Sequence, residues 1–71
     1  MESLQVAKRI RAFRKLRGLT QQQLSERVRI SVSVLGEIER GNRQIDDQIM
    51  KEICKQLNIS HDELASPGSF R

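Results

Sequence analysis

Apolar residues recur along this chain at helical rather than strand spacing. Val6, Ile10 and Phe13 are four and three residues apart, so they lie on one face of a first helix, with the basic residues mostly on its other faces. Gly18 predicts the end of this helix, because glycine readily adopts the left-handed conformation that closes helix C-termini. β-branched and polar residues do not alternate over any convincing stretch, so no strand is predicted.

Two short helices are predicted next. Thr20 and Gln23 have the spacing of a capping box, in which each side chain accepts a hydrogen bond from the backbone N–H of the other residue. A second helix therefore starts directly after Thr20 and ends near Arg29. Ser31 is a suitable N-cap for a third helix, predicted over about Ser31 to Arg40. Two short helices separated by about three residues form a helix-turn-helix.

Two further helices are predicted in the second half of the chain. Asp46 is a suitable N-cap for a fourth helix, and Ile45 and Met50 flank this cap at the spacing of a hydrophobic staple. Ser60 and Glu63 form a second capping box, which predicts a fifth helix of about one turn. The pattern as a whole therefore predicts five helices.

The size of the chain limits it to one domain. It has 71 residues, and a chain of this length has too little apolar material for a second core. We expect the domain to cover residues 1–65, followed by a flexible C-terminal tail over residues 66–71. Stability must come from aliphatic packing, because the lone Cys54 allows no intrachain disulfide.

Several classes of protein are not supported by the sequence. No apolar run is long enough for a membrane span, and an unpaired thiol without a secretory signal is typical of the reducing cytoplasm, so a cytoplasmic protein is expected. His61 has no Cys, Asp or Glu at metal-ligand spacing, and Cys54 is expected to be a core residue. No catalytic set or phosphate-binding glycine loop is found, so we expect no enzyme activity, metal, cofactor or small-molecule substrate.

Positive charge is concentrated at the N-terminal end. The net charge is +4, and residues 1–17 contain six basic residues against one acidic residue. Residues 44–71 contain three basic and five acidic residues. Such asymmetry favours a polyanionic partner such as nucleic acid, although a solvated helix face would have the same composition.

The chain resembles the phage repressor and Cro type of helix-turn-helix regulators, also known as XRE-like regulators. The resemblance covers most of the chain, from about Ala7 to Leu64. The order and spacing of the matching segments are distinctive, although no single segment is diagnostic. The matching residues are Ile10-Arg11-Ala12-Phe13-Arg14, Gly18-Leu19-Thr20-Gln21, Leu24, Ile30-Ser31, Ile38-Glu39-Arg40-Gly41 and Leu57-Asn58-Ile59-Ser60. It implies an all-α, compact, five-helix, lambda-repressor-like DNA-binding domain, in which helices 2 and 3 form the helix-turn-helix and helix 3 enters the major groove.

Four residues on the exposed, N-terminal side of the third helix are the candidates for reading bases: Val32, Ser33, Gly36 and Glu37. Val32 could contact a thymine methyl group, Ser33 can donate or accept, and Glu37 can accept from a cytosine amino group. Gly36 would permit close approach to the DNA, or it is a tolerated local weakness of the helix. Val32 and Val34 could instead pack against the domain or a partner protein.

The resemblance also implies residues that contact the DNA backbone. They are Thr20 and Gln21 at the start of the second helix, and Arg40, Asn42 and Arg43 around the end of the third. Contacts of this kind supply affinity and orientation rather than sequence information.

The resemblance further implies that Arg14 and Glu39 form an ion pair that links the first helix to the recognition helix. Four positions depart from the family pattern, among them Ile45, where proline is common, and Asp47, where an apolar residue is common. Arg29 stands where the family usually has glycine, which costs about 1 to 2 kcal/mol if the turn is left-handed. Ser25 replaces an alanine at the helix crossing and is accommodated if its hydroxyl bonds to a carbonyl one turn back.

The sequence therefore predicts a sequence-specific, double-stranded DNA-binding transcriptional regulator. A homodimer is expected, and the contact between copies would have to use helix five and nearby surface, including Leu64 and Phe70, or dimerisation is absent. A stand-alone controller or an antitoxin remains open as a subtype. The alternative is a protein-interaction adaptor that keeps the fold and uses Val32, Val34 and their neighbours to bind another protein.

Overall fold

The structure, a computed structural model, describes residues 2–65, which form five helices and no strand. The predicted all-α fold with five helices is therefore confirmed. The predicted tail over residues 66–71 lies outside the described residues. The helices are α1 (Glu2–Leu16), α2 (Gln21–Val28), α3 (Val32–Glu39), α4 (Asp47–Leu57) and α5 (His61–Ala65).

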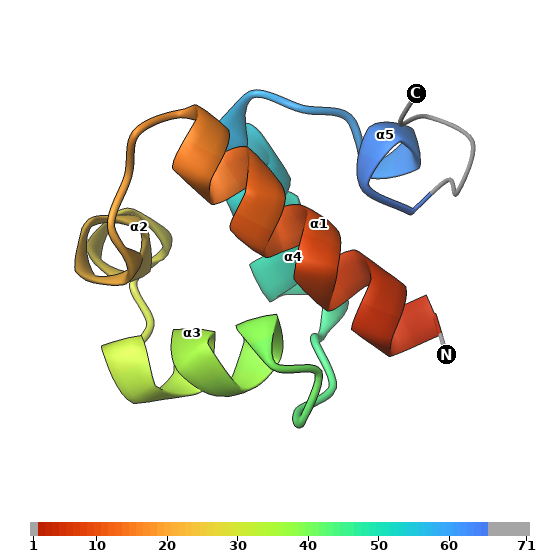
Figure 1. The fold of residues 1–71 in the computed structure, drawn as a ribbon, viewed down its shortest axis with the longest axis horizontal. Coiled ribbons are helices and arrows are strands. Elements are labelled where there is room, and N and C mark those ends of the chain that lie inside the picture. The colour runs from red at the N-terminus through yellow and green to blue at the C-terminus, as the bar shows by residue number, and fades with distance from the viewer. Residues whose placement is uncertain (1, 66–71) are drawn as a thin grey trace.

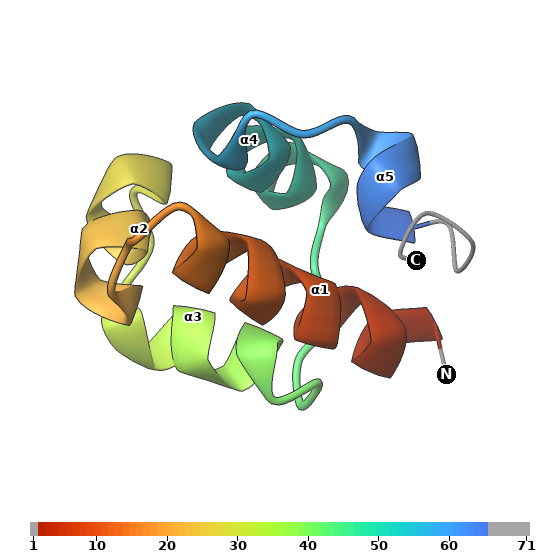
Figure 2. The same ribbon diagram turned by 45° about the horizontal axis from the view of Figure 1, so that its top comes forward.

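The long helix α1 occupies the middle of the molecule. It contacts α3, α4 and α5, whereas α2 packs against α3 and α4 (Figure 1). Turning the molecule shows α3 along one side of α1, with α4 and α5 on the other side (Figure 2). Helix α3 is therefore held against the body by one face, and its opposite face is directed away from the rest of the molecule.

One aliphatic core joins all five helices. Ile10 of α1, Leu24 of α2, Leu35 of α3 and Ile53 of α4 are fully buried within it. Burying an aliphatic side chain of this size contributes about 1.5 to 3 kcal/mol, so these positions carry much of the stability of a domain this small. The remaining buried apolar residues of the cluster are Val6, Val28, Ile38, Cys54, Leu57, Ile59 and Leu64.

The helix boundaries follow the capping residues that the sequence predicts. Thr20 accepts from the Gln23 backbone N–H, and the Gln23 side chain accepts from the Thr20 backbone N–H. Ser60 and Glu63 make the same reciprocal pair at α5. The Asp46 carboxylate accepts from the Ile49 N–H and so fixes the start of α4. Each cap satisfies a backbone donor that has no partner within its helix.

Helix α2 ends at a strained residue. Arg29 has φ 69° and ψ 41°, in the left-handed region. The strain, about 1 to 2 kcal/mol for a non-glycine residue, is accepted because this conformation turns the chain sharply into α3. The Arg29 and Ile30 N–H groups both donate to the Ser25 carbonyl, at 2.8 and 3.0 Å. The hydroxyl of Ser25 donates to the Gln22 carbonyl at 2.8 Å, as expected for this substitution.

One expectation from the sequence is wrong. Leu64 is fully buried, because it is the residue of the short helix α5 that faces the core, so it cannot supply a surface for contact between two copies. In α1, Lys8, Arg11 and Lys15 are exposed, as expected, whereas Arg9 and Arg14 are both only 7% exposed. Both guanidinium groups donate to the protein itself, which allows their burial.

The thiol of Cys54 lies on the inward side of α4 and is 6% exposed. Burial raises the pKa of this thiol, because desolvation disfavours the thiolate. None of the described helices is long and apolar enough to cross a membrane.

Cys54 should therefore react slowly with a thiol reagent while the protein is folded. The thiolate is the reactive species, and the raised pKa together with burial keeps it scarce and inaccessible at neutral pH. The measurement is the rate of disulfide exchange with Ellman's reagent at pH 7.5, with the urea-unfolded protein as the fast control. Equal rates in the two states would show that Cys54 is accessible.

Candidate nucleic-acid interface

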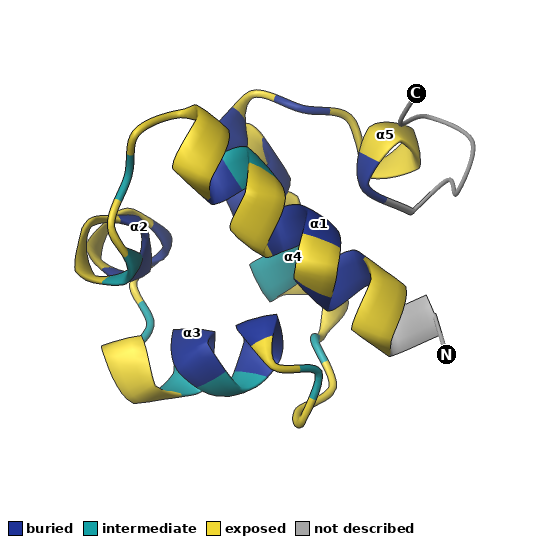
Figure 3. Cartoon of the chain, viewed as in Figure 1, coloured by how far each residue is buried: buried dark blue, intermediate teal, exposed yellow. Residues whose placement is uncertain are grey.

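The start of α3 is exposed (Figure 3). Val32 is 44% exposed, and Ser33 beside it is also exposed. Val34 instead packs partly against the core, which agrees with the structural alternative considered for it. Val32 and Ser33 therefore remain available for contact with a ligand.

Gly36 does not lie on the exposed side of α3, where it was expected. It is buried, because the side chain of Arg40 extends back along α3 and covers it. Long side chains of helices lean toward the N-terminus in this way. A Cβ at Gly36 would lie 3.3 Å from Arg40 Nη1, and the other near atoms also belong to the Arg40 guanidinium. In this structure the glycine accommodates Arg40, and a direct contact of Gly36 with a base would require Arg40 to move.

Two of the predicted DNA contacts are paired with each other. The Nε of Arg43 donates to Oε1 of Glu37 at 2.8 Å, and the two side chains are 48% and 42% exposed. An exposed pair of this kind contributes only about 0 to 1 kcal/mol, so it can open when a phosphate or a base competes. The sequence indicated neither the pair nor its geometry, because Arg43 lies in the loop beyond the helix.

The start of α2 is tied to the end of α3. The side-chain amide of Gln21 donates from Nε2 to Oε1 of Glu39 at 3.1 Å. Thr20, the N-cap, has an exposed side chain whose hydroxyl oxygen accepts from the Gln23 N–H in the capping box. Gln21 therefore has a defined orientation, with its amide oxygen not used in the contact with Glu39.

Arg14 and Glu39 form a bidentate ion pair between α1 and α3. Arg14 Nε lies 2.7 Å from Glu39 Oε2, and Nη2 lies 3.0 Å from Oε1. The two side chains are only 9% and 1% exposed. Arg14 Nη1 also donates to the carbonyl of Leu19 at 2.8 Å, so most of its donors are used. A pair buried and hydrogen-bonded to this extent fixes the orientation of α3 against α1.

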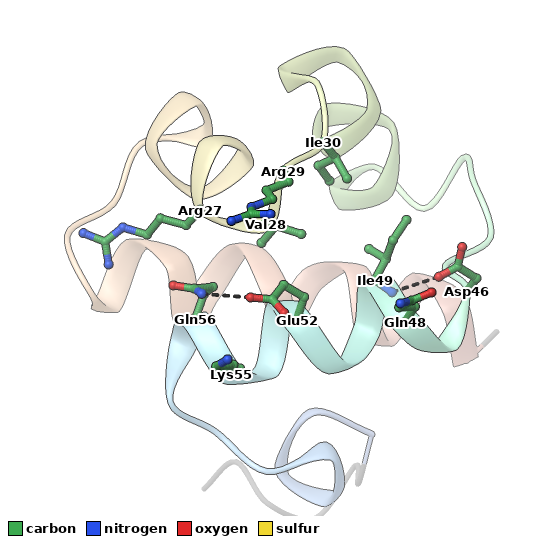
Figure 4. Close-up of a pocket in the computed structure, with 10 residues that line it drawn as sticks. All are labelled: Arg27, Val28, Arg29, Ile30, Asp46, Gln48, Ile49, Glu52, Lys55 and Gln56. Atoms are coloured by element: carbon green, nitrogen blue, oxygen red, sulfur yellow. Dashed lines mark hydrogen bonds between the residues drawn. The ribbon is translucent and has the colours of Figure 1, made fainter.

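A separate hollow of about 600 Å³ lies between the end of α2 and α4 (Figure 4). Its walls carry charges of both signs, including Arg27, Arg29 and Glu52. Glu52 accepts a hydrogen bond from Gln56 at 2.9 Å on the same helix. The mixed charge gives this hollow no clear preference for a polyanion. Among the described residues, no group of His, Cys, Asp and Glu could hold a metal ion.

Comparison with known proteins agrees with this geometry. A family model described as helix-turn-helix matches residues 10–64, which include all of α2, α3 and α4. The chain belongs to the helix-turn-helix family. This helix-turn-helix protein is 54% identical over 67 residues to the uncharacterized HTH-type transcriptional regulator YazB of Bacillus subtilis strain 168, covering 94% of this chain and 97% of YazB.

Solved structures of other regulators share the fold of this helix-turn-helix protein. The clp gene regulator ClgR from Corynebacterium glutamicum superposes with a TM-score of 0.88 at 26% identity, over 92% of this chain and 83% of that chain. The restriction-modification controller protein C.AhdI from Aeromonas hydrophila has a TM-score of 0.82 at 28% identity, over 86% of this chain and 92% of that chain.

The buried ion pair leads to a stability prediction. Glu39→Ala should lower the free energy of unfolding by about 3 to 5 kcal/mol, because it leaves the buried Arg14 guanidinium without its counter-charge. The matched control is Glu37→Ala, which removes an exposed pair and should cost about 0 to 1 kcal/mol. Urea denaturation of both variants measures the difference. A Glu39→Ala variant as stable as the wild type would show that the pair does not hold α3 in place.

The contact between Gly36 and Arg40 leads to a second prediction. Gly36→Ala should stabilise the fold by up to about 1 kcal/mol, because alanine is the better helix former and the new methyl group meets only a flexible side-chain end. The midpoint of denaturant unfolding measures this gain. A clear loss of stability would mean that the space over Gly36 is not as yielding as the contacts indicate.

Proposed function

We propose that this protein is a transcriptional regulator that recognises a short duplex DNA sequence by placing α3 in the major groove. The single observation that supports this most directly is the geometry of α3. One face is anchored by the buried Leu35, Ile38 and Glu39, while the opposite side and the N-terminal end are open. An α-helix fits the major groove, where each base pair presents a distinct pattern of donors, acceptors and methyl groups.

Three residues of α3 are proposed to contact base edges. Val32 is suited to a thymine methyl group, and Ser33 can donate or accept. Glu37 can accept from a cytosine amino group, and its pairing with Arg43 reduces the repulsion between its carboxylate and nearby phosphates. Gly36 is retained as a base-reading candidate only in a complex in which Arg40 leaves its position over the glycine.

Both ends of the recognition unit are proposed to contact the DNA backbone. Thr20 and Gln21 lie at the N-terminus of α2, where unpaired backbone N–H groups and the helix dipole favour a phosphate. Arg40, Asn42 and Arg43 follow the other end of α3 and are all exposed. Contacts on the two sides would position α3 between them without reading sequence.

We further propose that the protein binds DNA as a homodimer. Regulators that place a helix in the major groove commonly read two half-sites about 34 Å apart, one turn of the duplex. The molecule measures 30 × 23 × 19 Å along its principal axes, a size that lets two copies side by side present their α3 helices at this spacing. The dimer contact must use surface other than the buried Leu64.

Selection of bound sequences from a random duplex pool tests the proposal. The wild type should select a sequence motif. Ser33→Ala or Glu37→Ala should then relax the preference at particular base pairs of that motif. Arg43→Ala should instead weaken binding to all sequences about equally, because a phosphate contact carries no sequence information. Repeating the selection with each variant, and titrating the best duplex, measures both effects.

Absence of any motif or any salt-dependent binding at low salt would contradict this function. In that case the exposed Val32 would favour the adaptor alternative, in which the start of α3 binds another protein. An apolar protein contact does not weaken steeply with salt, whereas DNA binding does.

A further inference from the structure

A row of basic side chains follows one face of α1 beside the recognition helix. Lys8, Arg11 and Lys15 are three and four residues apart, so they lie above one another on the helix surface. All three are exposed. None of them belongs to the helix-turn-helix itself, and the proposed contacts of α2 and α3 do not use them.

These three residues form one wall of a groove between α1 and the end of α3. The groove has a volume of about 660 Å³, and Arg40 and Asn42 line its other side. At its end, Leu4 of α1 lies directly against Gly41, since a Cβ on that glycine would be 3.0 Å from Leu4 Cδ1. The two walls are therefore in contact, in agreement with the adjacent course of α1 and α3 in both ribbon views (Figures 1 and 2).

The charge of the groove is strongly positive. Lys8, Arg11, Lys15 and Arg40 supply four cations. The one acidic residue lining the groove within the described part of the chain is Glu39. Both of its carboxylate oxygens are already engaged, by Arg14 and Gln21, so it does not neutralise these cations. A concave surface with a single sign of charge concentrates its field and attracts a polyanion.

We propose that this groove, defined by Lys8, Arg11, Lys15, Arg40 and Asn42, is a second phosphate-binding surface that extends the contact with DNA from α3 onto α1. The inference rests on the proposed function. Arg40 and Asn42 belong both to the end of the recognition helix and to the groove, so a DNA strand held by these two residues continues toward α1. The backbone phosphates of the duplex are the ligand.

The length of the basic row agrees with this ligand. Lys8 and Lys15 are seven residues apart, which is a rise of about 10 Å along an α-helix. One strand of B-form DNA carries a phosphate every 3.4 Å along the duplex axis, so a row of this length can reach more than one phosphate. Flexible lysine and arginine side chains at this distance from α3 contact phosphates rather than base edges, so they add affinity without changing the sequence that is read.

The test compares two double variants that remove the same charge from different faces. Lys8→Gln/Lys15→Gln removes two exposed lysines of α1, of which Lys15 lies in the last turn. Lys51→Gln/Lys55→Gln is the control, since it removes two exposed lysines of α4, of which Lys55 lies in the last turn. Thermal melting checks that both variants are folded.

The measured quantity is the dependence of the DNA-binding constant on salt, using the best duplex selected with the wild type. Each lost phosphate contact should reduce the slope of log K against log salt by about 0.9, so the α1 variant should lose about 1.8. A fourfold rise in salt would then weaken the wild type about 12-fold more than the α1 variant. The control should keep the wild-type slope, and all three proteins should select the same motif.

An α1 variant with the same slope as the α4 control would overturn the proposed groove. If the double variant fails to fold, the single variants Lys8→Gln, Arg11→Gln and Lys15→Gln decide the question, each with an expected loss of about 0.9 in slope. A changed motif would mean that α1 contacts bases instead of phosphates, which also contradicts the proposal. Failure of the wild type to bind any duplex would contradict the proposed DNA-binding function itself. This outcome differs from failure of the groove, in which the wild type binds and the α1 variant keeps the same salt dependence.

Discussion

The orientation of the recognition helix depends on the ion pair between Arg14 and Glu39. It joins the last turn of α1 to the end of α3, and Gln21 extends it to the start of α2. Three helices therefore meet at one carboxylate whose side chain is 1% exposed. A charge in that position is tolerated only while each partner is present, so the arrangement has few alternatives of similar energy. Apolar packing alone would allow α3 to rotate more freely, since dispersion and burial have little directional preference.

The basic residues of the N-terminal segment are divided between two tasks. Arg9 donates to the Leu64 carbonyl, Arg14 binds Glu39, and Arg17 donates to the Leu57 carbonyl at 2.7 Å, so these three tie α1 to other parts of the fold. Lys8 and Lys15 are instead exposed on the face beside α3. The planar guanidinium with its five donors suits the fixed, internal contacts, and both guanidinium and ammonium groups can bind phosphates where they are exposed. Net charge alone does not distinguish these two roles.

Interactions within one turn of chain could be predicted from the sequence with good accuracy. The capping boxes at Thr20 and Ser60, the N-cap at Asp46 and the left-handed Gly18 all stand where expected. Such features depend on hydrogen bonds between residues three or four positions apart, so their geometry is contained in the local sequence. The aliphatic spacing also identified the inward faces of the helices, because helical periodicity determines which residues share a face. The family and the five-helix fold followed from these elements and their order.

Only the tertiary structure decided which residues distant in the chain are in contact. The sequence contained no sign that Arg40 covers Gly36, that Arg43 pairs with Glu37, or that Leu64 is wholly internal. It also could not show that the basic row on α1 shares a groove with Arg40, since these residues are more than twenty positions apart in the chain. Such contacts depend on the angles at which helices pack and on the paths of the loops, which are set by the balance of many weak interactions across the whole core. The sequence by itself determined the helices and the kind of surface they present, and only their packing decided which charges are internal and which are open to a ligand.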